Sequence, residues 1–205
     1  MADRIPILYE DDALLVCVKP RGLLSAKDAS GKPAVTDGLP GDLYPVHRLD
    51  REATGLMVFA KTAASAAFLG DAMGTAVRKE YLALCEGQPA PSGELTDLLY
   101  HDRVKNKTYV VQRKRNGVRE ARLSYEVLRG GETSLLRILL HTGRTHQIRV
   151  QFASRGFPLC GDRKYGAKTG GDLQLCAWKL TFPHPDGGTL SFTLPEDDCP
   201  YEKKG

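Results

Sequence analysis

An acidic side chain lies among basic ones in the segment His47-Arg48-Leu49-Asp50-Arg51. A carboxyl group flanked by guanidinium groups keeps its ionised form, and an ionised carboxylate acts as a nucleophile or a base. The structural alternative is that the aspartate caps its own turn and pairs with a neighbouring arginine. From these residues alone the structural interpretation is slightly preferred.

Two features after Asp50 indicate how the chain would position it. Residues 56–60 are continuously apolar, which is typical of a buried strand. Thr54-Gly55, just before them, allow an unusual backbone conformation at the strand entry. Asp50 is therefore expected on a loop at the mouth of a rigid sheet, where chemistry is often placed.

Four segments resemble, in order, the motifs of RNA pseudouridine synthases of the RluA/RsuA type. Residues 47–56 resemble the catalytic motif, usually HRLD, two variable residues, T or A, then SGL. Residues 19–23 resemble KP-x-GL, and residues 79–87 resemble K-x-Y-x-A-x-V-x-G. Residues 142–150 resemble TGRTHQIRV, followed by Gly156, Pro158, Gly161-Asp162 and Tyr165-Gly166. Each motif alone is a hypothesis, but four in register along almost the whole chain are a strong signal.

The chain departs from the family pattern at three places. Thr54 stands where the family commonly has serine, and Gln151 where it often has histidine. Residues 24–26 also differ from the usual ones. None of these departures removes a group that the expected chemistry needs, so they bear on substrate detail more than on activity.

The resemblance implies an isomerase that converts uridine in RNA to pseudouridine. The bond from ribose C1′ to uracil N1 breaks, the base rotates, and C5 joins C1′. No redox change occurs and no group enters from outside, so no cofactor is expected. The sequence agrees, because it contains no P-loop, no dinucleotide-binding glycine pattern and no clustered metal ligands.

The resemblance also implies the roles of three catalytic residues. Asp50 is the catalytic aspartate, and either attack on C1′ or abstraction of a ribose proton remains open. Arg149 is the expected ion-pair partner that keeps a buried Asp50 charged. Tyr81 is expected to stack on the uracil near C5. Without the motifs, Arg149 would be a solvated helix arginine and Tyr81 a core tyrosine.

Two arginines are expected to contact RNA around the reacting nucleotide. Arg48 would fill the gap left when the uridine swings out of the stack. Arg144, with Gly143 at a helix N-terminus, would hold a phosphate. His47 and His146 are expected to hydrogen-bond within their loops and not to take part in chemistry.

Residues 103–119 are strongly basic and contain no acid. Asn116-Gly117 is the strongest hairpin signal in the chain, and it predicts that residues 108–112 pair with residues 120–127. Such a hairpin is usually just a solvated charged surface. Beside an expected RNA cleft it is better interpreted as a phosphate-contacting arm. The candidate RNA-binding residues in it are Lys105, Lys107, Arg113, Lys114 and Arg115.

The 205 residues are expected to form a single catalytic domain, 1–205, with a possible break between lobes near 87–93 and a polar tail at 195–205. Most predicted elements are strands. One helix is predicted from Thr62 to about residue 73, with Ala67, Phe68 and Met73 toward the core, and another over residues 146–154, capped by Thr145. The fold class is therefore α+β, with a mixed, largely antiparallel sheet and helices packed on it. The resemblance adds two lobes around an active-site cleft.

Composition points to a soluble cytoplasmic protein, expected to be a monomer. The net charge of +4 is mild. The five cysteines are widely spaced and odd in number, which argues against a disulfide framework or a zinc site. No signal peptide and no membrane span is visible. No S4 module fits before the first strand, which favours a compact rRNA or tRNA stem-loop as substrate.

Two other functions remain as rivals. A glycoside or nucleoside hydrolase would also break a glycosidic bond, but it usually needs two carboxylates at a defined separation. Glu52 points away from Asp50 if the segment is extended. The second rival is a non-catalytic RNA-binding module of the same fold, and the presence of Asp50, Tyr81 and Arg149 speaks against it.

Overall fold

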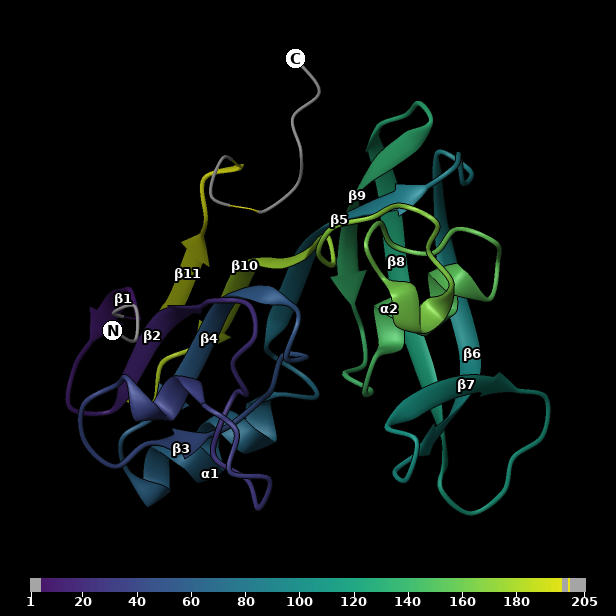
Figure 1. The fold of residues 1–205 in the computed structure, drawn as a ribbon. Helices are drawn as coiled ribbons and strands as arrows, with labels where there is room; N and C mark the ends of the chain where they lie inside the picture. The colour runs from purple at the N-terminus through teal and green to yellow at the C-terminus, as the bar shows by residue number, and fades with distance from the viewer. Residues whose placement is uncertain (1–4, 197–198, 200–205) are drawn as a thin grey trace. The chain divides into compact units, whose positions relative to one another are not determined.

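The computed structural model describes residues 5–196 and 199 (Figure 1). These residues form two compact units, the first from residues 5–79, 176–196 and 199, and the second from residues 80–175. Residues 87–93, the predicted lobe break, lie within the second unit. The predicted tail at 195–205 lies for the most part outside the described residues.

The first unit is built on antiparallel strands with one parallel pair. Its strands run in the order β1-β2-β4-β10, with β3 pairing β4 and β11 pairing β10. Only the β4–β10 pair among these is parallel. The bounds are β1 (Ile7–Glu10), β2 (Leu14–Lys19), β3 (Tyr44–Pro45), β4 (Thr54–Ala60), β10 (Leu175–Pro183) and β11 (Thr189–Thr193), with a short 3-10 helix η1 (Val35–Asp37). The apolar run at 56–60 is buried, as predicted.

Helix α1 (Ala63–Ala72) begins where the sequence predicted. Thr62 is the N-cap, and its Oγ1 accepts a hydrogen bond of 3.1 Å from the backbone N–H of Ser65. The predicted core face was wrong, because Ala67 and Phe68 are exposed whereas Ser65, Leu69 and Ala72 are buried. Alanine on several faces of a helix carries little directional signal, so the sequence could not show which stripe packs inward.

The second unit contains five strands in the order β5-β9-β8-β6-β7. The bounds are β5 (Arg78–Glu86), β6 (Ser92–Asp102), β7 (Lys107–Val111), β8 (Val118–Arg129) and β9 (Thr133–Leu140), with helix α2 (Gln147–Ala153) and the 3-10 helix η2 (Arg163–Tyr165). The pairs β6–β7, β6–β8 and β8–β9 are antiparallel. In Figure 1, α2 lies against the face of the strands β8 and β6.

The predicted pairing of the basic segment was wrong. Strand β7 pairs with β6, from Leu98 opposite Val111 to Asp102 opposite Lys107. β6 also pairs with β8, so it lies between the two strands that were expected to form a hairpin. The turn from β6 to β7 is closed by the Asp102 carboxylate, which accepts from the backbone N–H groups of residues 104 and 105. This local turn pairs β7 with the preceding strand β6, and not with the strand that follows Asn116-Gly117.

The predicted fold class is confirmed: the chain is α+β, and most strand pairs in it are antiparallel. No helix among the described residues is long and apolar enough to span a membrane.

Candidate active site

The backbone just before Asp50 is held by Ser25. The Ser25 hydroxyl oxygen accepts a hydrogen bond of 2.8 Å from the N–H of Leu49, and the hydroxyl donates one of 3.0 Å to the carbonyl of Leu49. Both residues are buried. One side chain therefore satisfies both backbone groups of the residue that precedes the carboxylate. This role was not predicted, because Ser25 lies in a loop without a recognisable pattern.

The backbone just after Asp50 is held by Lys19, whose side chain is fully buried. Its Nζ donates to the carbonyls of Pro20, Arg51 and Ala53 at 2.9, 2.9 and 2.7 Å. Burial lowers the pKa of Lys19 to about 8, although the carboxylates of Glu52 and Asp50 favour its charged form. A buried ammonium group thus organises the Asp50 loop and exerts a positive field on it.

His47 fastens the same loop to strand β4. Its Nε2 accepts a hydrogen bond of 3.1 Å from the backbone N–H of Val58. Burial, together with the charge of Lys79, lowers the pKa of His47 to about 3. The ring is therefore neutral and its Nε2 can accept a hydrogen bond. The bond was expected within the loop of His47, but it is formed with strand β4.

Gly55 sets the close approach of β4 to β10. Its φ angle is +110°, and a Cβ added there would lie 2.4 Å from the carbonyl oxygen of Ala177. Gly55 is opposite Ala177 in the parallel pair. Only glycine fits this position, which explains why a Thr-Gly entry precedes the strand.

The segment after Asp50 is a turn and not extended, since the N–H of Ala53 donates to the Asp50 carbonyl at 3.1 Å. The extended geometry assumed for Glu52 was therefore wrong. The expected direction of its side chain was wrong as well, because residues two positions apart in an extended strand share a face and Glu52 would not point away from Asp50. The Glu52 carboxylate forms an exposed ion pair with Arg51, with Nη2 and Oε1 2.7 Å apart. Arg48 is exposed on this loop.

In the second unit, Arg149 is buried and forms a bidentate ion pair with Asp162. Its Nε lies 2.7 Å from Oδ2 and its Nη2 lies 2.8 Å from Oδ1. Both side chains are almost wholly buried. Arg149 is thus not a solvated helix arginine. The sequence pointed to Asp162 only as part of a motif, without a role.

The sequence predicted Thr145 as the N-cap of helix α2, but His146 occupies that position. His146 has a φ of +54°, in the left-handed region, and no side chain caps the helix there. Nδ1 of His146 lies 2.8 Å from the hydroxyl of Tyr165. The left-handed backbone conformation of His146 is costly for a residue with a Cβ. The hydrogen bond to Tyr165 helps to offset this cost.

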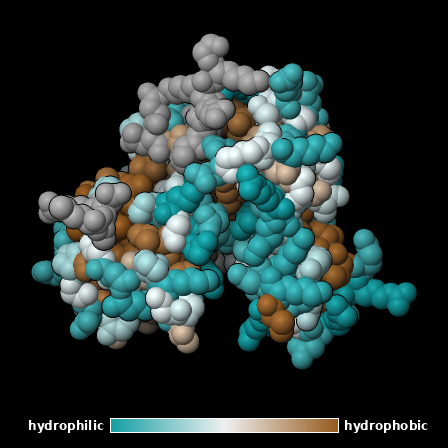
Figure 2. Space-filling view, in the orientation of Figure 1, coloured by the Kyte–Doolittle hydropathy of each residue, from teal (hydrophilic) through white to brown (hydrophobic). Residues whose placement is uncertain are grey.

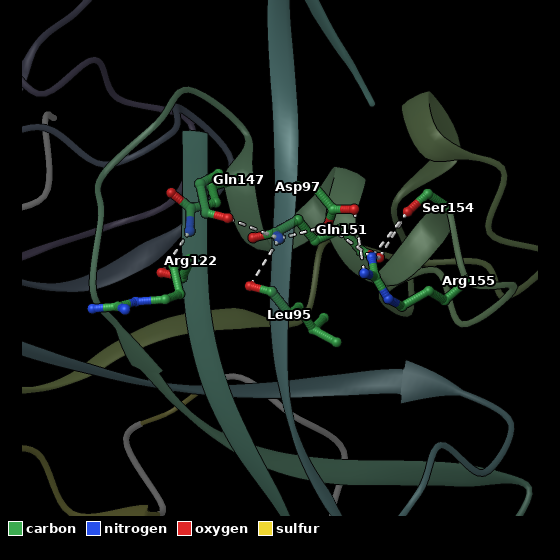
Figure 3. Close-up of polar contacts among 8 residues, drawn as sticks. Leu95, Asp97, Arg122, Gln147, Gln151, Ser154 and Arg155 are labelled. Carbon is green, nitrogen blue, oxygen red and sulfur yellow. Dashed lines mark hydrogen bonds and ion pairs between the residues drawn. The ribbon is translucent and has the colours of Figure 1, made fainter. Parts of the chain in front are cut away.

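Two glutamines one turn apart hold α2 to its neighbours (Figure 3). Oε1 of Gln147 accepts from the Thr142 hydroxyl at 2.8 Å and the Arg144 N–H at 3.0 Å, while its Nε2 donates to the Arg122 carbonyl at 3.1 Å. These contacts fix the segment that leads into the helix. Arg144 itself is exposed, and its Nε donates to the Glu120 carbonyl at 2.9 Å.

Gln151 is fully buried and holds the C-terminal half of α2 (Figure 3). Its Nε2 donates to the Asp97 carboxylate at 2.7 Å and to the Leu95 carbonyl at 3.3 Å. Arg155 pairs with the same carboxylate at 2.8 Å. Oε1 of Gln151 has no hydrogen-bond partner among the described residues. Gln151 therefore binds its neighbours through the N–H groups of Nε2. A histidine at this position would offer a ring N–H donor in the same role.

The predicted basic residues lie on β7 and on the loops at its two ends. Lys105, Arg113 and Lys114 are exposed, and the Arg115 guanidinium lies 4.8 Å from the centre of the Tyr100 ring. Nζ of Lys107 lies 5.4 Å from the Tyr165 ring centre. Figure 2 shows a mostly hydrophilic surface around this part of the second unit.

The predicted catalytic residues are divided between the two units. Asp50 belongs to the first unit, whereas Tyr81 on β5 and Arg149 on α2 belong to the second. Tyr81 is buried. The expected ion pair between Asp50 and Arg149 stays a prediction. Within the described residues, no three His, Cys, Asp or Glu side chains gather to hold a metal ion.

Comparison with known proteins identifies related sequences along most of the chain. It is 34% identical over 209 residues to the dual-specificity RNA pseudouridine synthase RluA of Escherichia coli O157:H7, covering 93% of each protein. It is 36% identical over 227 residues to the ribosomal large subunit pseudouridine synthase D of Nitrosomonas europaea, covering 96% of this chain and 64% of that protein.

A solved structure shows the same fold. The human RNA pseudouridylate synthase domain containing 4 superposes with a TM-score of 0.75 at 25% identity, over 94% of this chain and 89% of that one. The RNA pseudouridylate synthase family model matches residues 13–154. The family motifs, the fold and these relatives agree, and the chain belongs to the RNA pseudouridylate synthase family, whose members are isomerases.

Proposed function

We propose that this chain converts one specific uridine of a structured RNA to pseudouridine, with Asp50 as the catalytic carboxylate. The observation that carries the assignment is the support of the Asp50 backbone. Before Asp50, the Ser25 hydroxyl binds both backbone groups of Leu49. After Asp50, the Lys19 ammonium binds the carbonyls of Arg51 and Ala53. A reacting group needs such rigid support, because a small misplacement costs much of the rate.

The proposed reaction begins with extrusion of the target nucleotide, which costs a few kcal/mol in unpairing and unstacking. Arg48, exposed on the Asp50 loop, fills the vacated space and stacks through its flat guanidinium. Asp50 then acts on the ribose, either at C1′ or on a ribose proton. The freed uracil rotates and C5 bonds to C1′. The proton of C5 leaves, and N1, which has lost its bond to C1′, takes up a proton, so the product is an isomer of the substrate.

Arg149 is proposed to neutralise Asp50, and Tyr81 to hold the uracil near C5. Arg149 is suited to this task because its bidentate pair with Asp162 fixes the plane of the guanidinium. That pair occupies one edge of a group that has five N–H donors. Tyr81 lies buried on a strand, so its ring has little freedom to move.

The proposed RNA contacts are Arg48, Arg144 and the basic residues around β7. Exposed lysines and arginines of this kind bind phosphates without sequence preference and in a salt-dependent way. The candidates are Arg48, Arg144, Lys105, Lys107, Arg113, Lys114 and Arg115. We further propose a cytoplasmic monomer that acts on a stem-loop of rRNA or tRNA. The name of one relative, the ribosomal large subunit pseudouridine synthase D, supports rRNA as the substrate class.

The proposal is tested by restoring variants to a host strain that lacks the gene and mapping pseudouridine across its total RNA. Wild-type protein and Glu52→Gln should restore the missing site, because the Glu52 carboxylate forms its ion pair with Arg51 at the surface and is not assigned to the reaction. Asp50→Asn should restore nothing, although the shape of the residue is kept. Restoration by Asp50→Asn would favour the non-catalytic RNA-binding module, and release of free uracil from the RNA would favour the hydrolase.

A further inference from the structure

The hydroxyl of Tyr165 joins the basic strand β7 to the start of α2. The backbone N–H of Thr108 donates to it at 2.9 Å. On the other side, Nδ1 of His146 lies 2.8 Å away. The hydroxyl oxygen accepts from Thr108, and its contact with Nδ1 of His146 completes a bridge between the two segments.

The ring of Tyr165 meets two cations with different tasks. The guanidinium of Arg149 lies 5.2 Å from the ring centre, and Nζ of Lys107 lies 5.4 Å from it. Both distances are within the reach of a cation–π contact. The ring also packs against the apolar cluster of Leu99, Ala121 and Val150, so its position is set by the core. One aromatic ring thus touches a proposed phosphate contact and a proposed catalytic arginine.

The same turn carries the acid that orients Arg149. Asp162 directly precedes η2, and the N–H of Tyr165 donates to its carbonyl at 3.0 Å. A shift of Tyr165 therefore pulls on the bidentate partner of Arg149 as well as on the ring beside it.

Strand β7 has a second attachment to this region through Thr108, which is buried. Its Oγ1 donates to the Thr145 carbonyl at 2.8 Å and lies 3.0 Å from Nδ1 of His101. Lys107, which directly precedes Thr108, is half-buried beside Tyr165. The basic strand is consequently anchored to the segments on either side of Arg149.

We infer that Tyr165 is a positioning residue that couples contact of RNA at Lys107 to the orientation of Arg149. The inference rests on the proposed function, which supplies the roles of both cations. A phosphate that attracts the Lys107 ammonium acts on the ring that supports the guanidinium. Tyr165 then affects the chemical step more than RNA affinity, and the effect of Lys107 on that step runs through Tyr165.

The test uses single-turnover release of tritium from total RNA labelled at uracil C5, prepared from a host strain that lacks the gene. The same RNA is used in filter binding. Tyr165→Leu should lower the rate at saturating enzyme by about 100-fold and the affinity by less than about 3-fold. Tyr165→Phe keeps the ring and loses both hydroxyl contacts, so its rate should fall by about 10-fold.

Two controls separate coupling from general damage. Tyr100→Leu removes a ring that meets Arg115 but not Arg149, so it should leave the saturated rate within about 2-fold of wild type. Lys107→Met should lower the saturated rate in the wild-type background and have no further effect beside Tyr165→Leu. Lys105→Met, on an exposed residue of the turn, should weaken binding by the same factor in both backgrounds.

The inference is overturned if Tyr165→Leu, folded by circular dichroism, keeps the wild-type rate. It is also overturned if the rate losses of Lys107→Met and Tyr165→Leu multiply, because independent structural effects behave in this way. If Tyr165→Leu does not fold, an unchanged rate in Tyr165→Phe overturns it. Absence of tritium release by the wild-type protein would instead contradict the proposed function.

Discussion

The Asp50 loop of the first unit and helix α2 of the second are supported in different ways. The loop is held mainly through its backbone, because Ser25 and Lys19 bind the main chain before and after Asp50. Helix α2 is held mainly through side chains, in the pair of Arg149 with Asp162 and the network around Gln151. A loop lacks the hydrogen-bond pattern of regular structure, so neighbouring side chains must satisfy its backbone.

This comparison implies different weak points in the two regions. The loop should be most sensitive where its backbone fits tightly or loses a hydrogen-bond partner. Helix α2 should be most sensitive where a buried ion pair would lose the charge of one member. Four substitutions, taken in order of expected effect on the free energy of unfolding, examine this difference.

Gly55→Ala should have the largest effect. The new Cβ would lie 2.4 Å from the Ala177 carbonyl oxygen, and the position has a φ of +110°. Because the obstacle is backbone, the β4–β10 pair must separate. We expect a loss of about 4 kcal/mol or more, measured by urea denaturation. Gly70→Ala is the matched control, since nothing lies within 4 Å of the added atom and alanine favours a helix, so the protein should gain up to about 1 kcal/mol. Equal effects at the two glycines would contradict the steric account.

Asp162→Asn should follow, because it removes the charge of the carboxylate that forms the buried bidentate pair with Arg149. Breaking one side of a buried ion pair costs about 3–5 kcal/mol. Thermal and urea unfolding should both report the loss. Asp97→Asn provides the comparison within the same unit: its partner Arg155 is about one-third exposed, and water can replace part of the interaction. A smaller effect at Asp162 than at Asp97 would refute the view that α2 depends on its buried pair.

Ser25→Ala should remove both hydrogen bonds that bracket Leu49. The N–H and the carbonyl of Leu49 would stay buried without this partner, at a cost of about 2–3 kcal/mol in total. Tritium release should fall as well, since the backbone next to Asp50 loses its support. Ser30→Ala, in the exposed part of the same segment, should change neither quantity. Activity that survives Ser25→Ala unchanged would mean that the loop is held without this contact.

His47 should make stability depend on pH. Its pKa is about 3 in the folded protein and about 6.5 when unfolded, so only the unfolded chain takes up a proton between these values. The stabilisation is complete above about pH 6.5 and is lost as the pH falls toward 3.

The variant His47→Gln keeps an acceptor for the Val58 N–H but does not titrate. Between pH 7 and pH 5 the wild type should therefore lose about 1–2 kcal/mol more than this variant in urea denaturation. Parallel stability curves for the two proteins would show that His47 does not carry this dependence.

Local patterns predicted a large part of the fold and the candidate residues. The buried run at 56–60, the helix beginning after Thr62 and the α+β class all appear in the structure. The pairing of β7 was missed because β6 was not recognised as a strand, and the turn signal at Asn116-Gly117 then had no competitor. Strand partners depend on the whole set of strands, which local patterns do not contain.

Supporting contacts were the hardest to predict. Lys19 ends an apolar strand, and its ammonium is buried only because three carbonyls converge on it, two of them from residues more than thirty positions away. Asp162 is likewise thirteen residues from Arg149. Long-range polar contacts leave no periodic trace in a sequence, so neither role could be read from residue spacing.

What the amino-acid order determined by itself is a set of candidate catalytic residues, namely a carboxylate in a basic motif and the arginine and tyrosine of two further motifs, together with the glycine at the entry of a buried strand. These depend on residue type and short spacing, which are local properties. The tertiary structure alone decided which groups position these candidates. Lys19 and Ser25 hold the backbone around Asp50, and Asp162 and Tyr165 contact the side chain of Arg149. Buried polar groups must find partners wherever the fold brings them, and those partners come from distant parts of the chain.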